Sequence, residues 1–128
     1  MIAVDLSVLL RLVTEMGDPS SSTQVEVIDL YLEQSDGWIR ELNDAAQTGD
    51  SAQVRRMAHT LGSGSTLLGA DQLADLLADI GRLARGGSTD LASAGTSIAA
   101  EYDRVSIELR AYRVTLLEPP TGVEAKAE

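Results

Sequence analysis

The chain has 128 residues, the length of about one domain, and it contains no cysteine, which excludes a disulfide framework and a thiolate metal site. With 44% hydrophobic residues but no phenylalanine, it can form a core that suits packed helices better than a sheet sandwich. The formal net charge of −10 argues against nucleic acid as a partner, because proteins bind phosphate backbones mainly through cations.

The N-terminal segment lacks the features of a signal peptide. Asp5 and Arg11 interrupt its apolar run, and no basic leader precedes that run. Elsewhere, no apolar run approaches the roughly 20 residues that a membrane-spanning helix needs. We therefore expect a soluble, cytoplasmic protein that does not contact a membrane.

Two helices are expected in the first part of the chain. A short helix begins at Asp5 or Ser7 and stops at the Gly-Asp-Pro sequence of residues 17–19. A long helix follows, capped by one of the hydroxyl-bearing residues 20–23 and ended by Gly49. In both helices apolar residues recur every three or four positions, which predicts that this face is buried in the core. These residues are Leu6, Leu9, Leu10, Val13, Val25, Ile28, Tyr31, Leu32, Ile39, Leu42 and Ala46.

Three further helices follow in the rest of the chain. Asp50 is a good N-cap for the third helix, and the fourth begins near residues 70–71 and ends at residues 86–87, which are both glycine. The fifth starts after residues 88–90 and is closed by the two prolines at 119–120. The inward residues of the last two are Leu73, Leu76, Leu77, Ile80, Leu83, Leu91, Ala94, Ile98, Tyr102, Val105, Leu109, Tyr112 and Leu116.

Short connections make sequential helices antiparallel neighbours. No stretch shows the alternation of a strand, so the expected fold class is all-α. We expect an up-and-down antiparallel four-helix bundle with a short additional N-terminal helix. The bundle would form one domain over residues 1–117, and residues 118–128 would be a flexible C-terminal tail.

The third helix carries the only histidine of the chain, His59, on its polar face. On a helical wheel of about 100° per residue, the apolar stripe opposite to it consists of Val54, Met57, Leu61 and Leu68. The side of the helix around His59 carries Ala52, Arg55, Arg56, Gly62, Ser63 and Thr66. A lone histidine on a polar face is ordinarily a solvated surface residue, so its neighbours decide whether it has a function.

The Gly-Ser-Gly-Ser sequence at residues 62–65 allows two interpretations. Either the helix ends near Gly62 and a loop follows, or the helix continues. Leu61 and Leu68 are seven residues apart, which keeps the helical phase and favours the continuous helix. Each glycine inside a helix costs about 1 kcal/mol relative to alanine. Small residues beside an exposed His59 would let another protein approach it closely.

Residues 58–73, AHTLGSGSTLLGADQL, resemble the signature of histidine-containing phosphotransfer (Hpt) domains, which is roughly Ala-His-x-Leu-Lys-Gly-Ser-Ser-x-x-x-Gly-Ala-x-x-Leu. The residues that match this pattern are Ala58, His59, Leu61, Ser65, Gly69, Ala70 and Leu73. The similarity extends over about residues 22–85. The chain departs from the family at Gly62, where the family has lysine, at Ser63, where it has glycine, and at Gly64, where it has serine.

This resemblance implies a protein of a multistep two-component phosphorelay. The Nε2 atom of His59 would accept a phosphoryl group from an aspartate of a response-regulator receiver domain or a hybrid histidine kinase, and would pass it to another receiver aspartate. An imidazole is largely neutral and nucleophilic at about pH 7. The receiver is expected to supply the aspartate, a Mg²⁺ ion and a lysine. The chain itself would be a monomeric phosphocarrier without a cofactor, rather than an independent enzyme.

Residues around His59 are expected to bind the partner. Arg55 or Arg56, one turn before it, would supply the charge of the absent lysine, and folding the third helix onto the fourth brings Arg82 level with it. Gly81 stands where some family members have a polar side chain that holds the imidazole. The sequence therefore does not identify the residue that orients the ring of His59. The expected partner-binding residues are Arg55, Arg56, Gly62, Ser63, Thr66 and Arg82.

Other classes of function fit the sequence less well. A degenerate relative could act as an adaptor bundle that binds a signalling partner without carrying phosphate, and Gly62 in place of lysine is its best support. A di-iron bundle would need Glu-x-x-His pairs on inward faces, but position 56 is arginine and there is no second histidine. A Ser-His-Asp hydrolase would need a nucleophile elbow, which is absent from the sequence.

Overall fold

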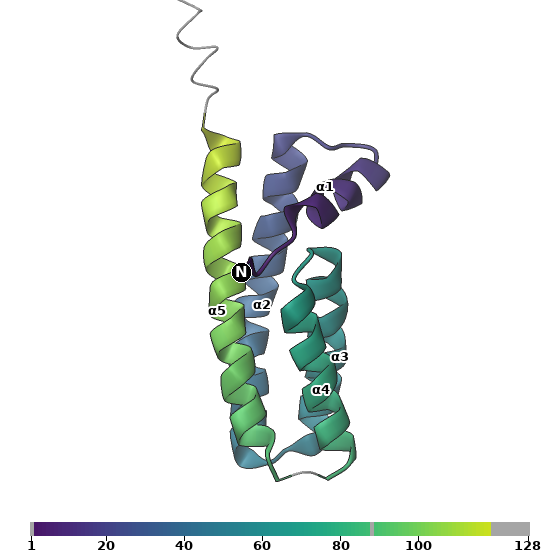
Figure 1. Ribbon diagram of the computed structural model, residues 1–128, viewed down its shortest axis with the longest axis vertical. Helices are drawn as coiled ribbons and strands as arrows, with labels where there is room; N and C mark the ends of the chain where they lie inside the picture. Colours follow the sequence, from purple (N-terminus) through teal and green to yellow (C-terminus); the bar gives the residue numbers. More distant parts are fainter. Residues whose placement is uncertain (1, 88, 119–128) are drawn as a thin grey trace, which may run out of the picture.

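The computed structural model describes residues 2–87 and 89–118, and over these residues the chain forms helices and no strand (Figure 1). The all-α prediction is therefore confirmed. The helices are α1 (Leu6–Glu15), α2 (Ser21–Thr48), α3 (Ser51–Leu67), α4 (Asp71–Arg85) and α5 (Leu91–Leu117). The predicted helix end at residues 119–120 and the rest of the predicted tail lie outside the described residues.

Local capping explains where the first three helices begin. The side chains of Asp5, Ser20 and Asp50 each accept a hydrogen bond from a backbone amide two or three residues further on. Gly49 ends α2 in the left-handed conformation with a φ of 77°, which favours glycine. These four positions agree with the caps expected from the sequence.

The helices α2 to α5 pack in a closed ring in which α2 and α4 each contact both α3 and α5. Figure 1 shows α2 and α5 side by side along the long axis, with the shorter pair α3 and α4 beside them and α1 lying across the end of that pair. The Glu108 carboxylate of α5 accepts hydrogen bonds of 2.8–2.9 Å from the amides of Ala3 and Val4. None of the helices described is both long and apolar enough to cross a bilayer.

The core lies between α2, α3, α4 and α5 and extends to Leu9 and Val13 of α1, and most of the predicted inward residues line it. The largest fully buried side chains include Leu9, Ile28, Leu42, Val54, Leu73, Leu77, Ile80, Ile98, Val105 and Leu109. Val25, Leu76, Ala94, Tyr112 and Leu116 are only partly buried.

The prediction that three leucines are buried in the core is wrong. Leu6, Leu10 and Leu83 are 37%, 46% and 36% exposed, respectively. Because α1 packs only against α2 and α3, it buries the narrow line of Leu9 and Val13. Leu83 lies beside the line that α4 buries and not on it, since that line continues from Ile80 and Gly81 to Ala84.

Candidate functional site

The helix α3 is continuous through its Gly-Ser-Gly-Ser sequence and ends only at Leu67, so the alternative of a loop at these residues is wrong. The hydroxyls of Ser63 and Thr66 donate to the carbonyls of His59 and Gly62, one turn earlier, over 3.3 and 3.0 Å. These hydroxyls thus find their hydrogen-bond acceptors within the helix itself. The prediction of an unbroken helix is confirmed.

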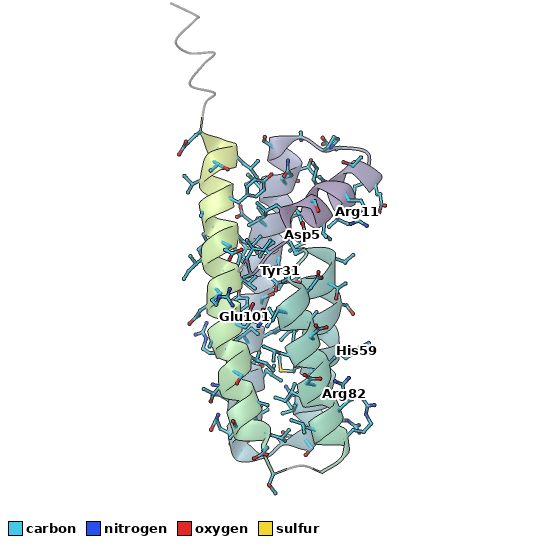
Figure 2. All side chains as sticks on the ribbon, in the orientation of Figure 1. Asp5, Arg11, Tyr31, His59, Arg82 and Glu101 are labelled. Atoms are coloured by element: carbon cyan, nitrogen blue, oxygen red, sulfur yellow. The ribbon has the colours of Figure 1, made fainter. Side chains whose placement is uncertain are left out.

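The His59 side chain is exposed, and Figure 2 shows it pointing away from the body of the bundle. The opposite face of α3 is buried in the core through Val54, Met57, Leu61 and Leu68. The apolar stripe thus fixes the rotation of α3 about its axis, which in turn directs the imidazole outward. This is the orientation that the helical wheel predicts.

A groove of about 500 Å³ runs along the seam between α3 and α4, with His59 in its wall. Small residues of both helices form its floor and sides, among them Ala58 and Gly62 on α3 and Gly81 on α4. A Cβ atom at Gly62 would lie 3.9 Å from the Cβ of Leu77, and one at Gly81 would lie 3.9 Å from the Cβ of Ala58. The groove therefore leaves open space beside the imidazole.

The groove has a cationic end. Arg55 of α3 and Arg82 and Arg85 of α4 line it, and no aspartate or glutamate occurs in its lining among the described residues. The Arg82 guanidinium forms an ion pair with Asp79, one turn earlier on α4. The lining of the groove is therefore positively charged, although the chain as a whole has a net charge of −10.

The structure brings together most of the residues that sequence analysis singles out. The groove is lined by His59 and by the predicted neighbours Arg55, Gly62, Ser63, Thr66 and Arg82. Arg56 does not line it, because its guanidinium turns to the side-chain oxygen of Gln53.

Arg85 also lines the groove and was missed by sequence analysis. The signal that could have found it is the antiparallel register of α3 and α4, carried one turn beyond Arg82. Trp38 of α2, the only tryptophan of the chain, does not line the groove; it is half-buried and packs against the core. In the part of the chain that the structure describes, no group of three or more histidine, aspartate or glutamate residues is placed to hold a metal ion.

Comparison with known proteins identifies the family. The model of the Hpt domain matches residues 26–110, about two thirds of the chain. The chain belongs to the Hpt domain family. Its structure is similar to the crystal structure of histidine-containing phosphotransfer protein B (HptB) from Pseudomonas aeruginosa PAO1, with a TM-score of 0.78 and 25% sequence identity. This similarity covers 88% of the present chain and 96% of HptB.

No curated protein sequence matches the chain significantly. The family match and the structural similarity agree with each other and with the resemblance in residues 58–73. The chain is thus a histidine phosphotransfer protein of a phosphorelay, a phosphocarrier and not an enzyme of the usual kind.

Proposed function

We propose that His59 is the phosphoacceptor of this Hpt domain. In the forward step, its Nε2 atom attacks the phosphorus of an aspartyl phosphate on a receiver domain; the N–P bond forms, the acyl P–O bond breaks, and the aspartate leaves as a carboxylate. The reverse step passes the group to another receiver aspartate. The single observation that carries this proposal is that the only histidine of the chain is exposed in the wall of an open groove.

The chain contributes positioning and charge to this reaction, which are the main requirements of phosphoryl transfer. The packed α3–α4 pair holds the imidazole at the surface, and the small residues Gly62 and Ser63 leave a path for the partner's active site. No cofactor of the chain itself is needed, because the partner receiver supplies the Mg²⁺ ion, the aspartate and a lysine in this proposal.

The proposed partner is the receiver domain of a response regulator or of a hybrid histidine kinase. We propose that it docks over the exposed side of α3 and the adjoining turn of α4. The residues that it contacts would be Arg55, Arg56, Gly62, Ser63, Thr66 and Arg82. The positive charge of the arginines suits a receiver active site, which gathers carboxylates around its metal ion. The protein would act as a cytoplasmic monomer.

The functional unit in this proposal is an up-and-down antiparallel four-helix bundle of α2 to α5, with α1 as an addition, over residues 1–117. The contacts of α2 and α4 with both α3 and α5 support the bundle. The contact of the N-terminal segment with Glu108 of α5 supports including that segment in the unit. Residues 118–128 would then be a tail that phosphotransfer does not require.

Transfer of a radioactive phosphoryl group tests the proposal. Receiver domains phosphorylated with labelled acetyl phosphate are mixed with the wild-type chain and with the variant His59→Gln. We expect a label on the wild-type chain that is labile in acid and stable in alkali, as a phosphohistidine is, and no label on the variant. If the wild-type chain binds a receiver from a broad panel but takes no label from any, the adaptor function is correct instead.

A further inference from the structure

The groove beside His59 is cationic at one end and neutral at the other. The antiparallel contacts of Gly62 with Leu77 and of Ala58 with Gly81 set the register of α3 against α4. Carried three or four residues further, this register places Arg55 level with Arg85 at the end where α3 begins and α4 finishes. Both guanidinium-bearing side chains line the same groove as the imidazole. The neutral end is lined mainly by small and hydroxyl-bearing residues, together with Leu77.

These two arginines differ from Arg82 in their partners. Arg82 is paired with Asp79, whereas neither Arg55 nor Arg85 makes a hydrogen bond or an ion pair within residues 2–87 and 89–118. Both side chains are exposed. Two like charges that line one groove from neighbouring helices repel each other, and a dianion bound between them would offset this repulsion while forming charge-assisted hydrogen bonds with both.

Helix electrostatics explains only one of the two. Arg85 lies in the last turn of α4, where a cation interacts favourably with the helix dipole. Arg55 lies near the beginning of α3, which starts at Ser51, and a cation gains nothing from the dipole there. A purely structural role therefore leaves Arg55 unexplained, whereas binding of an anion in the groove explains both positions.

We infer that Arg55 and Arg85 form a guanidinium pair that binds the oxygens of the phosphoryl group at His59. This inference rests on the proposed function. In it, α3 and α4 each contribute one arginine that binds the phosphoryl oxygens. While the Nε2–P bond forms and the acyl P–O bond breaks, negative charge is spread over the three remaining oxygens, and the pair neutralises it. The same pair would bind inorganic phosphate when His59 is unmodified.

Phosphoramidate, a small donor that needs no partner, tests the inference directly. The imidazole attacks its phosphorus, the P–N bond breaks and ammonia leaves. The rate of labelling of His59 is followed by ³¹P NMR in the wild-type chain and in the variants Arg55→Ala, Arg85→Ala and the double variant. Arg40→Ala is the matched control, because it removes one exposed arginine from α2, outside the groove.

We expect labelling of the double variant to be slower by at least roughly tenfold, with Arg40→Ala close to wild type. Titration with inorganic phosphate, followed through the ring resonances of His59, should give binding that weakens with added salt in the wild-type chain and is lost in the double variant. Thermal unfolding of each variant shows that the loss does not come from unfolding.

A rescue variant separates charge from structure. Position 62 has room for a side chain, since the nearest atom to a Cβ there is 3.9 Å away. Gly62→Lys in the double variant should restore a large part of the labelling rate, because it returns a cation to the groove. The inference is overturned if His59 is labelled but the double variant behaves like Arg40→Ala. If phosphate binds through the arginines and His59 accepts no label from phosphoramidate or from any receiver, the proposed function fails and the anion site stands.

Discussion

The backbone of Asp5 lies directly against Gly69, in the turn that joins α3 to α4. The amide of Asp5 donates to the carbonyl of Gly69 over 2.9 Å, and a Cβ atom at Gly69 would stand 2.3 Å from the carbonyl oxygen of Asp5. The φ of Gly69 is +81°, in the left-handed region. The turn next to the histidine groove therefore depends on the absence of a side chain at this position.

The variant Gly69→Ala should be strongly destabilised. The left-handed conformation alone costs alanine about 1–2 kcal/mol, and the clash with Asp5 adds to this because a backbone atom must move. Gly49→Ala is the control: its φ is +77°, but no atom described lies within 4 Å of its Cβ position. Urea unfolding should show only the cost of the left-handed conformation, about 1–2 kcal/mol, for the control and clearly more for Gly69→Ala. Equal losses would mean that the contact with Asp5 is unimportant.

Alanine should have opposite effects at two glycines inside helices. At Gly62 the added methyl group meets only the Cβ of Leu77 at 3.9 Å, so the better helix propensity of alanine should stabilise the protein by about 0.5–1 kcal/mol. At Gly95 of α5, the methyl group would lie 2.9 Å from the Cβ of Ala46 and would push α2 and α5 apart. A net loss of about 1–3 kcal/mol is expected there. Thermal unfolding of the two variants checks the signs, and stabilisation by Gly95→Ala would contradict the packing described.

The buried hydrogen bond between Tyr31 and Ser65 should stabilise the contact of α2 with α3. Its two oxygens are 2.9 Å apart. Ser65→Ala leaves the phenol with one partner fewer and should cost about 1–2 kcal/mol. Ser63→Ala, on the exposed side of the same helix, should change stability by no more than about 0.5 kcal/mol. A double-mutant cycle of Ser65→Ala with Tyr31→Phe isolates the pair, and a coupling energy near zero would show that the bond contributes nothing.

Stability should fall at alkaline pH because of Tyr102. Burial, followed by the hydrogen bond to the Asp36 carboxylate, raises the pKa of Tyr102 above its ordinary value of 10.0. Above about pH 10, the tyrosine has lost its proton in the unfolded chain but still holds it in the folded chain, so the free energy of unfolding decreases as the pH rises. Below it, the contribution is fully present.

The variant Tyr102→Phe tests this directly. Its free energy of unfolding should decline less than that of the wild type between about pH 8 and about pH 11. Some decline remains, because burial also raises the pKa of Tyr31. Identical slopes in urea titrations of the two proteins across this range would contradict the account.

The helices and the outward direction of His59 can be predicted from the sequence, because both depend on interactions between residues that are close together in the chain. The caps at Asp5, Ser20 and Asp50 satisfy free amides within a few residues, and the apolar spacing of α3 fixes which face is buried. The error at Leu83 has the opposite origin: periodicity shows which side chains are apolar, but only the neighbouring helices determine how wide a stripe is covered.

The groove was only partly predictable. Gly62 and Ser63 mark it in the sequence as small residues beside a histidine, and folding α3 onto α4 places Arg82 near by. Arg85 follows only when the same antiparallel register is carried one turn beyond Arg82. Arg56, predicted to bind the partner, lies outside the groove because its side chain turns toward Gln53, a choice of rotamer that no sequence pattern reveals.

Mapping the phosphoryl group after transfer from a receiver tests the central claim most directly. The labelled chain is kept in alkali, digested, and examined by mass spectrometry and ³¹P NMR. A single phosphoryl group on Nε2 of His59 is the predicted result. A phosphoryl group on any other side chain, or a receiver that loses its phosphate to water in the presence of the chain while His59 stays unmodified, would contradict the account.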